Sequence, residues 1–156
     1  MNHTIQVVYL IGVDHRIQYT NNTCGPEWRQ DIKSFEDYLV SKTEEMKIEL
    51  LAEEFSQENI ERNNATGCTV KDAAQRCHKQ HLFCDPTKSE RESEGIDDDD
   101  KRENFWLEKL KNSNASVIMF VCGDSHINSF SEKVRANMVQ TKILSNGWGN
   151  DWMYKQ

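Results

Sequence analysis

Two apolar runs that each end in glycine constrain the fold of this chain most. The runs "TIQVVYLIG" (4–12) and "ASVIMFVCG" (115–123) are rich in β-branched and aromatic residues and carry no charge. Runs of this length and composition are typical of strands buried on both faces, which occur in parallel sheets covered by helices. We therefore expect both runs to lie inside a sheet.

Helical and strand patterns alternate along the rest of the chain. Apolar spacing and capping signals predict helices over 28–39, 56–62 and 70–77, from about 87–92, around 105–110, and over 127–134. Further strands are expected over 47–55, 81–86 and 141–145. This alternation predicts an α/β fold, with about five mostly parallel strands sandwiched by helices in a single domain covering 1–156.

The composition of the chain indicates which cellular compartment and which classes of binding partner to expect. The net charge of −7 disfavours binding to nucleic acid or to anionic membranes. The five cysteines include no Cys-x-x-Cys pair, which indicates free thiols in a reducing compartment. The sequence shows neither a signal-peptide pattern nor an apolar run of about 18 residues. We expect a cytoplasmic protein with no nucleic-acid or membrane partner.

A Gly-x-x-His motif closes both apolar runs, as "GVDH" (12–15) and "GDSH" (123–126). Chance predicts about 0.2 such matches in a chain with seven glycines and five histidines. The carboxyl ends of parallel strands meet at one edge of a sheet, where ligands bind. The repetition therefore predicts that His15 and His126 lie close together at this edge.

Carboxylates follow two further predicted strands at the same edge. Glu53 and Glu54 end the second strand, and Asp85 ends the third. Because adjacent strand residues point to opposite faces, we expect only one of the two glutamates to face the histidines. The sequence does not decide between them.

The combined residue types suit two kinds of chemistry. His15, Glu54 and His126 could ligate a divalent metal such as Mn²⁺ or Zn²⁺. The same imidazoles and carboxylates equally suit a metal-free acid–base pair. Asp14 and Asp124, inside the motifs, could orient the imidazoles or bind metal, but capping or turn formation is their more common role.

Other residues offer competing sites. Arg91 could clamp an anionic substrate, or could pair on the surface with Glu90 or Glu94. Cys122, next to Gly123, could act as a nucleophile, although its place inside an apolar run favours burial.

A zinc site is the alternative interpretation of a histidine–cysteine cluster. The cluster consists of Cys77, His78, His81 and Cys84. No second ligand pair follows it, so core packing of the two cysteines is favoured. His81 begins a predicted strand and is therefore expected at the edge opposite the histidine motifs.

The three segments "GVDH" (12–15), "AEE" (52–54) and "GDSH" (123–126) resemble the TIKI/TraB and erythromycin-esterase-like/ChaN superfamily, of which this chain would be a small bacterial member. The resemblance implies a hydrolase-type site on an α/β fold. TIKI members are metal-dependent proteases, erythromycin-esterase relatives activate water with histidine and glutamate, and ChaN-like members are linked to haem. By position, the resemblance makes His15 and His126 the paired histidines and Glu53 or Glu54 the acid.

A further segment, "HLFCDPTKSERE" (81–92), is similar to one in small bacterial proteins of this shape. That similarity implies Asp85 and Arg91 as additional site residues. The chain is shorter than most members of the superfamily and lacks the helical insertions that shape their substrate pocket.

The sequence supports two hypotheses about function. The first is a small hydrolase that cleaves an ester, amide or phosphoester bond in a small-molecule or peptide substrate. Its expected catalytic residues are His15, Glu53, Glu54, Asp85, Arg91 and His126. The second is a non-catalytic ligand-binding or regulatory module that uses the same crevice. Trp148 and Trp152 are expected to pack back on the domain or to form a homodimer contact.

Overall fold

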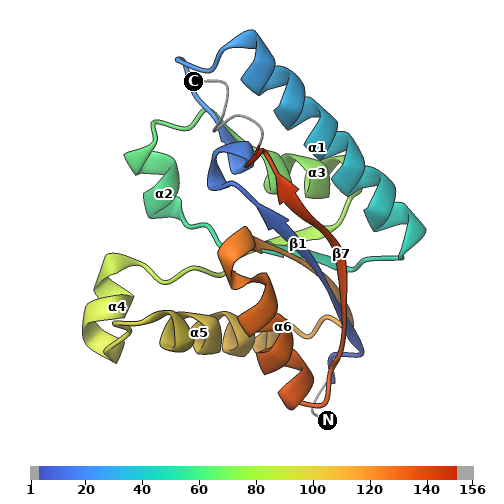
Figure 1. Cartoon of the computed structure of the whole chain (residues 1–156), viewed down its shortest axis with the longest axis vertical. Coiled ribbons are helices and arrows are strands. Elements are labelled where there is room, and N and C mark those ends of the chain that lie inside the picture. The colour runs from blue at the N-terminus through green and yellow to red at the C-terminus, as the bar shows by residue number, and fades with distance from the viewer. Residues whose placement is uncertain (1–3, 151–156) are drawn as a thin grey trace.

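The computed structural model describes residues 4–150, and its centre is a five-stranded sheet in which every pairing is parallel (Figure 1). The strand order is β5–β3–β6–β1–β7. The strands are β1 (Val7–Val13), β3 (Leu50–Glu53), β5 (Gln80–Phe83), β6 (Val117–Gly123) and β7 (Gln140–Trp148). The predicted α/β fold with five parallel strands is therefore confirmed. A separate antiparallel pair, β2 (Tyr19–Thr20) with β4 (Gly67–Cys68), was not apparent from the sequence.

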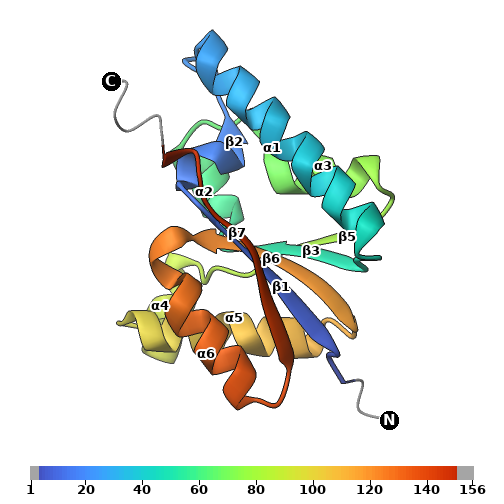
Figure 2. The same ribbon diagram turned by 45° about the vertical axis from the view of Figure 1, so that its right-hand side comes forward.

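Helices cover both faces of the sheet (Figure 2). One face carries α1 (Pro26–Glu45) and α3 (Thr69–Arg76). The other carries α4 (Lys88–Glu94), α5 (Asp99–Asn112) and α6 (Ile127–Ala136). The short helix α2 (Gln57–Arg62) follows β3. Two 3₁₀ turns, η1 (His15–Gln18) and η2 (Asp124–His126), follow β1 and β6, so each Gly-x-x-His motif leads from a strand into a turn. No helix in the 4–150 range is both long and apolar enough to cross a bilayer.

Alternating strand residues divide the interior into two cores. In β6, Phe120 packs on one face against Trp106 and Phe130, with ring centroids 5.5 and 4.9 Å away. Met119, on the opposite face of β6, belongs to the core that contains Phe35 of α1. Each of these large side chains stabilises the fold by about 1.5–3 kcal/mol when fully buried. The apolar composition of both strand faces follows from this two-sided burial.

Side-chain caps begin the helices next to the carboxyl edge. The Ser56 hydroxyl accepts a hydrogen bond from the Asn59 N–H and starts α2. Thr87 and Glu90 form a capping box at α4. Asp98, in the run of four aspartates, accepts from the Lys101 N–H and starts α5. These caps fix the start of the helices that carry much of the site described below.

Trp148 packs back on the domain, as expected, rather than projecting from it. Its ring lies 5.2 Å from that of Phe35 and 4.9 Å from that of Tyr38, measured between centroids. Trp152 lies outside the described residues.

The chain topology opens a crevice between the carboxyl ends of β3 and β6. The chain leaving β3 passes through α3 to β5, on one side of β3. The chain leaving β6 passes through α6 to β7, in the other direction along the sheet. Divergence of two neighbouring connections is the feature that creates ligand crevices in open parallel sheets. Glu54 follows β3, and Gly123 and His126 lie at the end of β6.

Candidate functional site

Two histidines and one glutamate meet at this crevice. His15 Nε2 lies 3.6 Å from Glu54 Oε1, and His126 Nε2 lies 3.7 Å from Glu54 Oε2. The side chain of His15 is 50% exposed, whereas those of His126 and Glu54 are 8% and 4% exposed. Glu54 is therefore the glutamate that faces both histidines, and Glu53 does not.

A glutamine fixes the protonation pattern of His15. The Gln18 amide nitrogen donates to Glu53 Oε1 at 2.9 Å and to the Glu54 carbonyl at 3.4 Å. Because both of these atoms can only accept, the amide orientation is set and Gln18 Oε1 must accept a hydrogen bond. Its partner, 2.7 Å away, is His15 Nδ1, which therefore carries the proton. The neutral ring keeps a lone pair on Nε2, the nitrogen that faces Glu54.

Glu53 lies on the other face of the sheet and supports this arrangement from behind. Its carboxylate is fully buried and accepts hydrogen bonds from Gln18 and His81. The expectation that His81 lies at the opposite edge is wrong. β5 has only four residues, so its second residue, His81, is not far from the carboxyl end. The strand register pairs His81 with Leu51, whose side chain lies on the same face of β3 as that of Glu53. The imidazole of His81 therefore reaches the carboxyl end of β3.

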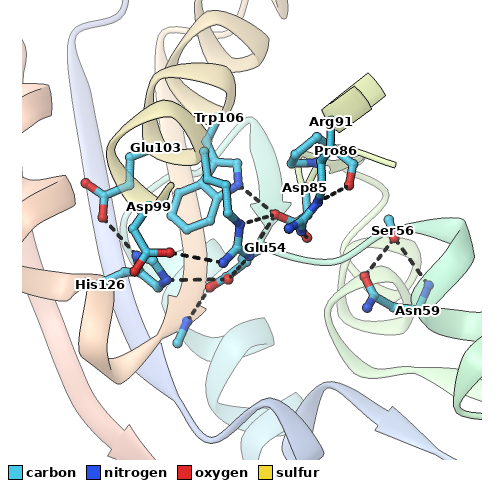
Figure 3. A network of polar contacts seen from close by, with 12 residues as sticks. Glu54, Ser56, Asn59, Asp85, Pro86, Arg91, Asp99, Glu103, Trp106 and His126 are labelled. Atoms are coloured by element: carbon cyan, nitrogen blue, oxygen red, sulfur yellow. Dashed lines mark hydrogen bonds and ion pairs between the residues drawn. The ribbon is translucent and has the colours of Figure 1, made fainter. Parts of the chain in front are cut away.

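His126 is held by a second acid that the sequence analysis missed. His126 Nδ1 lies 2.8 Å from Glu103 Oε2, and the Ser129 hydroxyl donates to the same oxygen at 2.6 Å. Figure 3 shows Glu54 and Glu103 on opposite sides of the His126 ring. Since Glu103 accepts from Nδ1, the neutral ring of His126 also presents an unprotonated Nε2 to Glu54. A charged residue on the apolar stripe that contains Trp106 and Leu110 is the signal that could have revealed Glu103.

Arg102 of α5, also missed, joins the carboxylates of the site. Its NH2 group contacts Glu54 Oε2 at 2.5 Å and Asp85 Oδ1 at 3.0 Å. Asp85 accepts further hydrogen bonds from Arg91 at 3.0 Å and from the Trp106 indole at 3.1 Å (Figure 3). Burial lowers the pKa of Arg102, but Asp85 and Glu54 outweigh it and raise the pKa overall. The guanidinium therefore stays charged and holds the Glu54 carboxylate in place.

Arg91 has a different partner from those expected on the surface. It pairs with Asp85 and also donates to the Pro86 carbonyl at 3.3 Å, rather than pairing with Glu90 or Glu94. Both Asp85 and Arg91 line the same cleft as the histidines, so all but Glu53 of the expected catalytic residues share it. The cleft encloses about 380 Å³.

The aspartates of the two motifs have structural partners. Asp14 caps η1 by accepting from the Arg16 N–H at 3.0 Å and pairs with the Arg16 guanidinium. Asp124 accepts from the Asn150 amide at 3.0 Å. Capping, one of the two common roles, therefore describes Asp14, whereas the Asp124 side chain makes a long-range contact.

The expected metal ligands do not fit a divalent cation well. Glu54 Oε2 is taken by the Arg102 guanidinium, and Glu54 Oε1 accepts from the Gly123 N–H at 2.9 Å. A metal bound by Glu54 would lie against a fixed positive charge. Across residues 4–150, no group of three or more His, Cys, Asp or Glu side chains is arranged to hold a metal ion.

The histidine–cysteine cluster near residue 80 is likewise dispersed. Cys77 Sγ faces the Val40 carbonyl, His78 is exposed, His81 faces Glu53, and Cys84 is buried in the core. These directions favour core packing for Cys84 and give the cluster no common centre.

Cys122 is not placed to act as a nucleophile. It is fully buried, and burial, followed by the nearby charges of Glu54 and Glu103, raises the pKa of its thiol well above the ordinary value. At pH 8 we expect iodoacetamide to leave Cys122 of the folded protein unmodified, as measured by peptide mass spectrometry. The same treatment in denaturant should modify it fully. Rapid labelling of the folded protein would show that the thiolate is accessible.

The glycine of the second motif provides the space that His15 occupies. A Cβ atom on Gly123 would lie 2.8 Å from His15 Nε2. We expect Gly123→Ala to displace the half-exposed His15 ring, and so to lower activity at least tenfold, a loss typical when a catalytic group is misplaced. Gly25→Ala is the matched control, because a Cβ there meets no atom within 4 Å. Equal activity in the two variants would mean that the position of His15 is unimportant.

Comparisons with known proteins do not add to this geometry. Scans of protein-family models, curated proteins and solved structures each gave no match. Membership in the TIKI/TraB and erythromycin-esterase-like/ChaN superfamily therefore stays a prediction.

Proposed function

We propose that this protein is a small hydrolase that uses His15 and His126 as an acid–base pair without a metal. One observation carries the proposal. Both imidazoles have Nδ1 held by an acceptor, Gln18 or Glu103, and both direct Nε2 at the carboxylate of Glu54. Fixing Nδ1 with an acceptor leaves Nε2 to exchange protons, which is how catalytic histidines are prepared.

The proposed reaction uses one histidine in each role. His15, the exposed ring, takes a proton on Nε2 from a water molecule, and the resulting hydroxide attacks the electrophilic centre of the substrate. His126, entering as the imidazolium, gives its Nε2 proton to the leaving group as the scissile bond breaks. The proton on His15 then returns to His126 through solvent or Glu54. Each imidazolium is stabilised by the carboxylate that lies between the two rings.

Arg102 and Asp85 have a positioning role in this proposal. Arg102 keeps Glu54 between the rings, and Asp85 keeps Arg102 in place. The size of the cleft, about 380 Å³, suits a small molecule or the end of a peptide. The non-catalytic alternative, a binding or regulatory module, uses the same cleft and differs only in lacking turnover.

The proposal is tested with p-nitrophenyl acetate, p-nitrophenyl phosphate, bis(p-nitrophenyl) phosphate and a peptide p-nitroanilide. We expect hydrolysis of at least one of these, unchanged after dialysis against EDTA, because no step requires a metal. Loss of activity on chelation and its recovery with Mn²⁺ or Zn²⁺ would overturn the metal-free mechanism. Failure to hydrolyse any of them, or activity that survives in the double variant His15→Asn/His126→Asn, would contradict the assignment.

A further inference from the structure

The cleft is rich in arginine, although the protein is acidic. Four arginines line it, namely Arg16, Arg62, Arg91 and Arg102, against two carboxylates, Glu54 and Asp85. The chain has seven arginines and twelve lysines, and none of the lysines lines the cleft. Because the net charge of the protein is −7, its surface as a whole repels anions. The arginine-rich lining is therefore a local property of the site.

Carboxylates pair with three of these arginines, and within the described part of the chain the fourth has no counter-ion. Arg16 pairs with Asp14 and Arg91 with Asp85. Arg102 is shared among three carboxylates, those of Glu54, Asp85 and Asp99. Arg62, exposed at the end of α2, has no ion-pair or hydrogen-bond partner for its guanidinium within the described part of the chain. A second hollow of about 200 Å³ adjoins the first and shares Arg62, Asp85 and Arg91 with it. The guanidinium of Arg62, unpaired within residues 4–150, thus lies where the two hollows meet.

Arginine, rather than lysine, indicates the kind of anion. A guanidinium presents planar, paired N–H donors that match two oxygens of one phosphate or carboxylate, whereas an ammonium acts as a point charge. Several arginines around one cleft suit an anion with three or four oxygens better than a single carboxylate, because each can engage a different pair of oxygens.

Two aromatic rings contribute to the same lining. Tyr19 and Phe55 stack with centroids 6.1 Å apart and an interplanar angle of 17°. Burial raises the pKa of Tyr19, with the Arg16 charge opposing it, so the phenol stays protonated at neutral pH and can donate a hydrogen bond. The half-buried Tyr19 therefore offers a further donor for oxygens, and Phe55, only 3% exposed, supports its ring.

We infer that the substrate carries a phosphoryl group, and that Arg62 with Arg91 holds its non-bridging oxygens beside His15. The cleavage step in this inference rests on the proposed function, whereas the binding of the phosphoryl group does not. In the step, water adds to phosphorus through a new P–O bond and gives a proton to His15. The bond to the leaving oxygen breaks with its electron pair, and that oxygen takes a proton from His126. The products are an alcohol and a phosphate with one ester bond fewer.

Calorimetric titration with inorganic phosphate tests the binding part directly. We expect phosphate to bind the wild-type protein, and Arg62→Ala to weaken its Kd at least about tenfold through loss of one charge-assisted contact. Arg62→Ala should fold normally, because the side chain is exposed and unpaired among the described residues. Arg135→Ala is the matched control, since Arg135 lies in the last turn of α6, away from the cleft, and should keep the wild-type Kd.

Further titrations distinguish a phosphoryl ligand from a carboxylate ligand and test whether the ligand binds where hydrolysis occurs. Succinate in place of phosphate should bind more weakly, and equal or tighter succinate binding would overturn the phosphoryl assignment. Phosphate should also compete with whichever phosphoester the protein hydrolyses, p-nitrophenyl phosphate for a monoesterase or bis(p-nitrophenyl) phosphate for a diesterase.

The outcomes distinguish failure of the ligand class from failure of the activity. Hydrolysis of p-nitrophenyl acetate without phosphate binding would overturn the ligand class and leave the hydrolase intact. Phosphate binding that depends on Arg62, without turnover of any ester, would overturn the hydrolase and leave the ligand class intact. His15→Asn should bind phosphate like the wild type and lose only turnover.

Discussion

His15→Asn is expected to lower kcat/KM by about 10²–10⁴-fold, the usual contribution of a general base. The side chain is half exposed, and it forms a hydrogen bond with Gln18. Folding therefore depends little on it, and the free energy of unfolding should change by less than about 0.5 kcal/mol. Steady-state kinetics on the best substrate, with a denaturant titration of the same preparation, measures both quantities.

His78→Asn provides the control for this substitution. His78 is exposed, does not line the cleft, and has a φ of 56°, which asparagine adopts readily. We expect this variant to keep wild-type kinetics. A large loss of stability in His15→Asn would show that His15 has a structural role. An unchanged kcat/KM would show that it has no role in catalysis.

Arg102→Ala should produce the largest loss of stability among the site variants, about 3 kcal/mol. It removes the counter-charge of two carboxylates whose side chains are only 4% and 8% exposed, Glu54 and Asp85. Asp85 keeps Arg91 and Trp106 as partners, and Glu54 keeps the Gly123 N–H, so the fold should survive. For a chain of this size the loss corresponds to a fall in Tm on the order of 10 °C, measurable by calorimetry.

A second substitution separates charge from geometry at this position. Arg102→Lys keeps one positive charge but cannot span Glu54 and Asp85 with a planar guanidinium. We expect it to recover part of the stability lost in Arg102→Ala and little of the activity. The loss of a buried counter-charge should lower Tm by much more than about 1–2 °C. If Arg102→Ala lowers Tm by only about 1–2 °C, solvent replaces the guanidinium at little cost.

The fold was predictable from sequence because its signals are local and strong. The run of β-branched residues that ends at Gly123 could be read without knowing any neighbour, and so could the capping pattern of Thr87 and Glu90. The two-residue strands β2 and β4 gave no signal, because pairing of so few residues depends on where η1 and α3 place them.

The candidate site was only partly predictable, since most of its contacts join distant parts of the chain. The paired motifs indicated His15 and His126, and strand ends indicated Glu54 and Asp85. Gln18 belongs to no recognisable sequence motif. Its amide is important only because Glu53 accepts a hydrogen bond from it and so fixes its orientation. Arg102 resembles any charged helix residue until the fold brings it to Glu54, 48 positions away. Register, which the sequence does not specify, placed His81 beside Glu53.

The histidine tautomers test the central claim most directly. Long-range ¹H–¹⁵N NMR spectra at pH 9, where an ordinary imidazole is neutral, report which ring nitrogen carries the proton in each of the five histidines. We predict that His15 and His126 both carry it on Nδ1, and that Gln18→Leu removes this preference for His15 alone. Protonation of both rings on Nε2 would place their donors, instead of their lone pairs, against Glu54 and would contradict the account.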